Sequence, residues 1–289
     1  MKRAFIYIIF AGILWGTSGF FVKALSPYGV TAPQMSFFRA AVSLAVIGGF
    51  AAFADRSVFR VRPRDLPLLI ASGVALFGTG TCYYTSMQMT SVSTAVVLMY
   101  TAPILVMLYS VTFLGEKLTW LKGISVGGML VGCALVSGVI GGMRFDAVGV
   151  LVGLGSGISY AAYNILTKLQ MRRGIAPLSA TFYCFLTAAC VSFFACKPAA
   201  IPACIAKDPL SVWLLILGIG IITYVLPYFF YTNSLKVLPV GTASALGIVE
   251  PMAATVFSIL FFHEQLTVVS GCGILLILGS TFLLSRSKE

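Results

Sequence analysis

Two stretches of the chain align with one another without a gap. Residues 93–123 read STAVVLMYTAPILVMLYSVTFLGEKLTWLKG, and residues 241–271 read GTASALGIVEPMAATVFSILFFHEQLTVVSG, a shift of 148 positions. The shift pairs Pro103 with Pro251 and also matches Thr, Ala, Glu, Leu and Gly residues. Apolar sequences align by chance through Leu and Val, but matched Pro, Glu and Gly in one block indicate an internal duplication.

The rest of the chain supports the same duplication. A shift of 145 positions pairs Lys23 with Lys168 and Phe37 with Phe182. We therefore predict two homologous units, the first spanning residues 1–144 and the second residues 145–289.

The composition is that of an integral membrane protein. Of the 289 residues, 59% are hydrophobic and 9% are charged, and the mean hydropathy is +1.02. A soluble domain has about 25% charged residues. The net charge of +11 would suggest a nucleic-acid partner in a soluble chain, but the Lys and Arg residues lie mainly between apolar runs. Orientation in a lipid bilayer explains them better, and we expect no nucleic-acid partner.

Ten runs are apolar and long enough to be membrane-spanning helices, which need about 20 residues each. They are residues 4–25, 31–53, 66–88, 91–114, 119–140, 147–171, 176–196, 211–234, 240–262 and 265–285. The predicted fold is an all-α polytopic membrane protein with two five-helix repeats. Because five is an odd number, the second repeat enters the membrane in the opposite sense, and the repeats are inverted.

The basic residues predict the orientation. With the N-terminus inside, fourteen Lys and Arg residues lie on the inner side and four on the outer side, while Arg39 lies within the membrane. Cytoplasmic segments of membrane proteins carry an excess of Lys and Arg. Both termini are therefore expected in the cytoplasm.

No cofactor or metal site is expected. The seven cysteines form no CxxC pair, and only Cys196 and Cys204 fall near a loop, where a disulfide is open. The chain contains no GxxxxGK[ST] phosphate-binding loop. Energy for any transport must then come from a proton gradient, from exchange or from the gradient of the substrate.

Several motifs carry a family resemblance. They are an Arg early in the second run (QMSFFRAAVSLA), a Pro in the fourth (YTAPILV) with LGEKLTWLKG after it, and an EP pair in the ninth (GIVEPMAATVFS) followed by HEQLTVVSG. The chain resembles the drug/metabolite transporter superfamily, specifically its EamA-type branch, over its whole length. The resemblance implies a transporter in a bacterial-type plasma membrane. Similar proteins export amino acids and other metabolites, and some relatives take solutes up.

Two ionisable residues lie deep in the predicted spans. An acid at the bilayer centre costs about 2.5–3.5 kcal/mol, so we expect Glu250 to face the interior of the bundle. It would exchange a proton or meet a cationic group of the substrate; the alternative is a structural carboxyl bonded to a neighbouring helix. Arg39 would bind a substrate carboxylate; the alternative is bracing of helix ends.

Aromatic and amide side chains at helical spacing are candidates for lining a central cavity. The candidates are Trp15, Tyr84, Gln88, Tyr100, Tyr160, Tyr163, Asn164, Tyr224 and Tyr228. Tyr83 is expected instead to anchor its helix at the membrane interface. Gly247, Pro103 and Pro251 are expected at a bend or a close helix contact, because proline removes a backbone hydrogen bond and glycine allows close approach.

The leading hypothesis is a secondary transporter that works by alternating access and exports an amino acid or related metabolite. Uptake of an organic cation is the alternative, because one deep acid among many aromatics suits cation–π binding. A membrane-embedded enzyme and a passive channel fit less well, since a nucleophile with a base is missing and an inverted repeat is typical of transporters. The expected partners are lipid, a small substrate and protons, and the chain is expected to be a monomer or homodimer.

Overall fold

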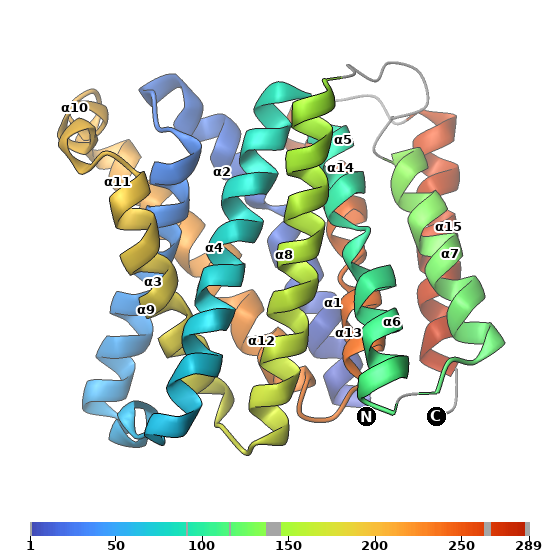
Figure 1. Cartoon of the computed structure of the whole chain (residues 1–289). Helices are drawn as coiled ribbons and strands as arrows, with labels where there is room; N and C mark the ends of the chain where they lie inside the picture. Colours follow the sequence, from blue (N-terminus) through green and yellow to red (C-terminus); the bar gives the residue numbers. More distant parts are fainter. Residues whose placement is uncertain (1, 91, 116, 137–145, 263–266, 287–289) are drawn as a thin grey trace.

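The computed structural model describes residues 2–90, 92–115, 117–136, 146–262 and 267–286, and within these ranges every regular element is a helix (Figure 1). The α-helices are α1 (Lys2–Gly16), α2 (Ser18–Leu25), α3 (Ala32–Phe53), α4 (Leu66–Met89), α5 (Val92–Met99), α6 (Ala102–Phe113), α7 (Trp120–Val136), α8 (Ala147–Arg172), α9 (Pro177–Ala195), α10 (Ile201–Ile205), α11 (Pro209–Gly220), α12 (Leu226–Ser234), α13 (Val240–Leu246), α14 (Val249–Phe262) and α15 (Val268–Arg286). The long helices run side by side as one bundle, and the start of α1 and the end of α15 lie at the same end of it (Figure 1).

Six helical segments are long and apolar enough to cross a bilayer. They are Arg3–Tyr28, Ala32–Phe53, Pro63–Ser86, Ala147–Arg172, Pro177–Ala195 and Pro209–Ser234. Shorter apolar helices of 10–17 residues lie at Val97–Phe113, Trp120–Leu135, Val240–Ala254 and Gly271–Leu284. The chain is therefore an all-helical polytopic membrane protein, as its composition predicts.

Several predicted spans are interrupted near their middle. The fourth predicted run divides into α5 and α6 at Tyr100 and Thr101, and the ninth divides into α13 and α14 at Gly247 and Ile248. A proline follows each interruption, Pro103 in the first turn of α6 and Pro251 in the first turn of α14. Proline suits the first turn of a helix, where its missing N–H has no helical acceptor.

The eighth predicted run contains a π-helical turn, η5 (Ile221–Val225), between α11 and α12. Pro227 lies just after it and cannot donate to the carbonyl of Thr223, which an α-helix would require. The wider turn accommodates this missing hydrogen bond. Short π-helical turns are rare and occur often at functional sites.

Helices of the two halves pack against one another throughout the bundle. These contacts include α4 with α8, α7 with α15, α3 with α9, α1 with α12, α4 with α9, α1 with α14, and a smaller contact of α6 with α8. Exchanging each helix with its predicted repeat partner converts the α4–α8 contact into α12–α1 and the α1–α14 contact into α8–α6. The α3–α9 and α7–α15 contacts are converted into themselves.

Glycines bring some of these helices into backbone contact. A Cβ on Gly16 at the end of α1 would lie 2.7 Å from the Cβ of Ala253 and 3.0 Å from the carbonyl of Glu250. A Cβ on Gly157 of α8 would lie 2.5 Å from the Thr101 hydroxyl and 2.9 Å from the Leu98 carbonyl. Both approaches are to the interrupted helices, so α1 and α8 pack closely against them.

Candidate functional site

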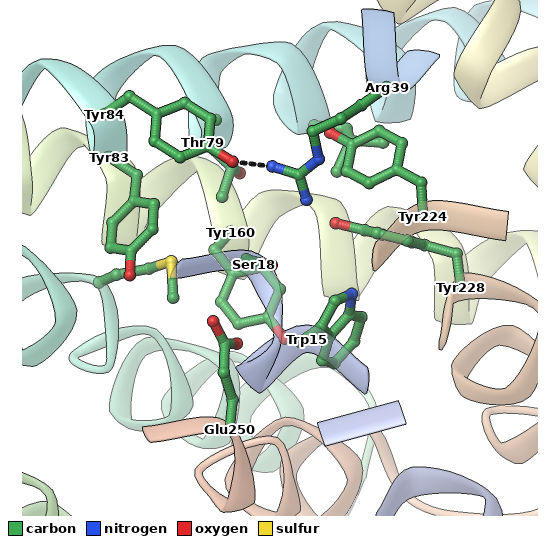
Figure 2. Close-up of a pocket in the computed structure, with 13 residues that line it drawn as sticks. Trp15, Ser18, Arg39, Thr79, Tyr83, Tyr84, Tyr160, Tyr224, Tyr228 and Glu250 are labelled. Atoms are coloured by element: carbon green, nitrogen blue, oxygen red, sulfur yellow. Dashed lines mark hydrogen bonds between the residues drawn. The ribbon is translucent and has the colours of Figure 1, made fainter. Parts of the chain in front are cut away.

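A narrow pocket lies in the middle of the bundle, bordered by α1, α2, α3, α4, α5, α8, η5, α12 and α14 (Figure 2). Its lining residues are Trp15, Ser18, Arg39, Leu76, Thr79, Gly80, Tyr83, Tyr84, Met99, Tyr160, Tyr224, Tyr228 and Glu250. The cavity volume is about 50 Å³. That space holds a few water molecules, whereas pockets for small organic ligands measure about 300–1,000 Å³. Binding of a metabolite would therefore require the helices to separate.

Glu250 enters the pocket from the start of α14. Its Oε2 accepts a hydrogen bond from the Tyr100 hydroxyl at 2.8 Å, and the same hydroxyl lies 2.9 Å from the Gly247 carbonyl. Tyr100 is fully buried. A hydroxyl has one proton to donate, so Tyr100 donates to only one of these oxygens at a time. This contact joins the α5–α6 interruption directly to the α13–α14 interruption.

Arg39 enters the pocket from α3 and is buried, with 7% of its surface exposed. Its guanidinium donates to the Tyr84 hydroxyl and lies 4.0 Å from the centre of the Tyr224 ring, within the range of a cation–π contact. Among the described residues, its Nε has no hydrogen-bond partner. A buried donor without a partner is unfavourable, so this N–H is available to an acceptor in the pocket.

Trp15 borders the pocket from the end of α1, where Gly16 brings that helix against α14. Its ring contacts Tyr228 at 5.3 Å and Tyr231 at 5.5 Å between centroids. The indole Nε1 is buried and, within the described part of the chain, has no hydrogen-bond partner. Trp15 thus offers the pocket a second N–H donor on an otherwise apolar side chain.

Tyrosines form most of the remaining wall. Tyr224 comes from η5 and Tyr228 from α12, with their ring centroids 4.9 Å apart. Phe185 of α9 stacks on Tyr224 at 5.1 Å, which fixes that ring from behind. Figure 2 shows the Arg39 guanidinium and the Glu250 carboxylate pointing into the pocket from opposite sides, with the rings of Tyr160 and Trp15 between them.

Most of the side chains predicted to line a cavity meet here, but some lie behind the wall. Tyr163 packs on Tyr228 at 5.6 Å, and Asn164 bridges the Tyr231 hydroxyl at 2.8 Å and the Ser244 hydroxyl at 3.2 Å. Neither borders the pocket. These two residues brace α8 against α12 and α13.

Other residues singled out in the sequence lie away from the pocket or outside the described part of the chain. The Gln88 side chain is outside it, and so are Glu116 of the LGEKLTWLKG motif and His263 and Glu264 of the HEQLTVVSG motif. Cys196 and Cys204 are separate free thiols, so the disulfide that the sequence left open is absent between these two described residues.

The interfacial interpretation of Tyr83 is wrong, because this residue lines the pocket. The pocket also includes residues that sequence reasoning missed, namely Ser18, Leu76, Thr79, Gly80 and Met99. Leu76, Thr79, Gly80 and Tyr83 follow an i, i+3, i+4, i+7 spacing on α4, which places them on one helix face. That spacing was the available signal for them.

The profile of the EamA-like transporter family matches this chain twice, over residues 2–138 and again over residues 147–286. The chain belongs to this family. The resemblance inferred from the residues is confirmed.

Relatives of this EamA-like protein are named as transporters. An uncharacterized transporter of Archaeoglobus fulgidus is 26% identical, covering 96% of this chain and 95% of the relative. The threonine/homoserine exporter RhtA of Escherichia coli is 28% identical, covering 98% of this chain and 92% of the relative. A solved protein structure has a TM-score of 0.80 at 19% identity and covers 98% of each chain, a likeness that concerns the fold alone.

Proposed function

We propose that this EamA-like protein exports amino acids or closely related metabolites by alternating access. The observation that carries the proposal is the opposed pair of Arg39 and Glu250 in one aromatic pocket. An amino acid at neutral pH has a carboxylate and an ammonium group. Arg39 and the Trp15 N–H are suited to the carboxylate, and Glu250 is suited to the ammonium group.

The proposed architecture is ten membrane-spanning helices in two inverted five-helix repeats, residues 1–144 and 145–289. The two family matches support it, because each falls within one half. The paired helix contacts and the interruptions that precede Pro103 and Pro251 also support it. Interrupted helices in corresponding positions of two repeats are a common feature of transporter substrate sites.

The name of one group of relatives supports the choice of substrate. RhtA proteins of Escherichia coli and Salmonella typhimurium, which match almost the whole chain, are named threonine/homoserine exporters. Uptake of an organic cation is the alternative, and the aromatic wall is compatible with it. Arg39 disfavours this alternative, because a buried guanidinium repels a substrate whose only charge is positive.

The proposed energy source is proton exchange at Glu250. One carboxyl group cannot hold a proton and pair with an ammonium group at the same time. Substrate and proton would therefore occupy the site alternately, and inward movement of protons would drive outward movement of substrate. The 50 Å³ cavity requires the two halves to move apart before substrate enters, which suits a rocking motion.

The proposed location is the bacterial inner membrane with both termini in the cytoplasm. The fourteen-to-four distribution of Lys and Arg supports this orientation. The position of the start of α1 and the end of α15 at one end of the bundle is compatible with an even number of crossings (Figure 1). The proposed oligomeric state is a monomer or homodimer.

The test uses purified protein reconstituted in liposomes loaded with threonine or homoserine. We expect labelled substrate outside to exchange with the unlabelled pool and an imposed pH gradient to change the rate. Glu250→Gln should remove the pH dependence and weaken substrate binding roughly tenfold to a hundredfold, because a charge-assisted bond is lost.

The matched control is Asp208→Asn, which makes the same acid-to-amide change at a partly exposed helix N-cap where Asn also serves. This variant should transport like the parent. Equal rates and pH profiles for the parent and the Glu250→Gln variant would overturn the proton role. Exchange of a monovalent organic cation without exchange of amino acids would favour the alternative substrate.

A further inference from the structure

A second, larger pocket lies where α6 and α8 end and α7 and α13 begin. These helix ends lie at one end of the bundle (Figure 1). The pocket volume is about 360 Å³, within the range of small-ligand sites and several times that of the central pocket. It is separate from the central pocket, since the two share no lining residue.

Four positive side chains border this pocket. Lys117 and Lys122 come from the first half of the chain, and Lys168 and Arg172 come from the second half. No Asp or Glu is among the described residues that line it. Glu116 precedes Lys117 and is outside the described part of the chain; with its single charge counted, the four positive charges would still leave a net charge of three.

Backbone carbonyls hold three of these side chains in place. Lys122 Nζ donates to the Lys117 carbonyl at 3.2 Å. Lys168 Nζ donates to the carbonyls of Leu235 at 3.0 Å and Leu238 at 2.6 Å, and Arg172 donates to the Leu114 carbonyl at 3.0 Å. Carbonyls at helix ends orient a cation but carry no full charge. Arg172 also keeps further N–H donors, since a guanidinium has five.

We propose that this basic pocket binds a phosphate-bearing anion, either the headgroup of an anionic lipid or free phosphate. Arginine and lysine are the usual phosphate ligands in proteins, and basic pockets between membrane helices bind anionic headgroups. Capping of helix ends accounts for the three held side chains but not for Lys117. That side chain is exposed and, in the part of the chain that the structure describes, forms no hydrogen bond or ion pair.

An anionic lipid could contact the apolar residues at the rim of this pocket, whereas inorganic phosphate could not. Leu114 and Pro239 border the pocket, and Val237, also in its lining, is 55% exposed. A lipid would contact this rim with its acyl chains while its phosphate met the cations, whereas inorganic phosphate would use the cations alone. Because the ligating cations come from both halves, a bound anion would hold the halves together at this end.

The test measures thermal unfolding of delipidated protein in a neutral detergent. Separate samples receive short-chain phosphatidylglycerol, short-chain phosphatidylcholine or inorganic phosphate at constant ionic strength. A ligand that binds the folded state raises the melting temperature. We expect phosphatidylglycerol to raise it and the zwitterionic phosphatidylcholine to have little effect; a further rise with inorganic phosphate would show that the phosphate group alone suffices.

The variant Lys117→Gln removes a charge that makes no described contact, so it should fold. It should raise the apparent Kd for the anion about two- to fivefold, as loss of one partly exposed charge pair does. Lys236→Gln is the matched control, because Lys236 is exposed, lies one residue before Val237 and does not line the pocket. Equal weakening by both variants, or no stabilisation by either anion, would overturn the proposal. Neither outcome depends on whether the protein exports amino acids.

Discussion

The two interrupted helices at the centre of the bundle share a backbone design but differ in chemistry. The α5–α6 and α13–α14 interruptions precede matching prolines, Pro103 and Pro251. The residue before each proline differs, however. It is Ala102 in the first half, with 0% of its surface exposed, and Glu250 in the second half, which lines the pocket.

This difference teaches that the two proposed repeats share the place where a helix breaks but differ in the side chains there. The first half contributes a neutral hydroxyl, Tyr100, and the second half contributes the acid that it contacts. A single carboxyl between two similar halves gives the site one position for one proton or one ammonium group. A pair of acids so close together would repel one another, and one of them would stay protonated.

The largest expected effect comes from moving the acid to the other interruption. In the Ala102→Glu variant the carboxylate would enter a fully buried position, at a cost of roughly 3 kcal/mol in stability. Thermal unfolding in detergent measures this loss, with Glu250→Ala as the folded, inactive control. The double variant Ala102→Glu, Glu250→Ala moves the acid completely. If its melting temperature and its transport rate equalled those of the parent, the two interruptions would be interchangeable, and the chemical difference between them would not matter.

A smaller effect is expected from the matched glycines Gly157 and Gly12, which lie 145 positions apart and each pack on one interruption. A Cβ on Gly157 would lie 2.5 Å from the Thr101 hydroxyl, whereas a Cβ on Gly12 would lie 3.0 Å from the Val249 Cβ. Overpacking costs about 1–3 kcal/mol, and replacing a helical Gly by Ala gains about 1 kcal/mol.

We therefore expect Gly157→Ala to lower stability by about 1–2 kcal/mol and Gly12→Ala to change it little. Melting temperatures of the two variants, measured side by side, test the difference. The reverse order would mean that α1 fits its interruption more tightly than α8 does, contrary to the distances.

An effect of similar size, on transport in place of stability, is expected from Tyr100→Phe, which removes the hydroxyl between the two interruptions. The carboxylate of Glu250 loses a hydrogen-bond donor, so substrate exchange should weaken and its pH profile should change. The expected loss is about 1–2 kcal/mol, or a five- to thirtyfold weaker apparent affinity at a fixed pH. Exchange measured across a pH series in liposomes tests this. Tyr7→Phe, outside the pocket, is the control, and an unchanged pH profile for Tyr100→Phe would contradict the role of the hydroxyl.

Much of the central pocket could be predicted from the sequence because charge and hydroxyl groups are costly in lipid. Arg39, Glu250, Tyr84, Tyr160 and Tyr224 border the pocket for that reason, since each needs a polar neighbour that lipid does not supply. The apolar helical segments could also be predicted from the sequence, because a hydropathy profile gives the length of each one.

The sequence did not predict how each helix is rotated about its axis or how deep each residue lies in the bundle. On α8, Asn164 lies one position after Tyr163 and three positions after Ala161. These spacings do not show which side of α8 faces the pocket. Tyr83 and Tyr84 are neighbours, yet both reach the pocket, since they are the i+7 and i+8 positions of the α4 face that begins at Leu76. The π-helical turn was also missed, although Pro227 was the signal for a disturbed hydrogen bond.

That turn determines which face α12 presents. Successive residues of an α-helix are rotated by about 100°, so a π-helical turn, which accommodates one extra residue, changes the direction of every side chain after it. Tyr228 and Tyr231 lie after η5, and both contact Trp15. Deleting a single residue between Gly220 and Leu226 would restore a regular helix and turn both tyrosines away from Trp15. The aromatic wall therefore depends on the number of residues in this segment as well as on their identity.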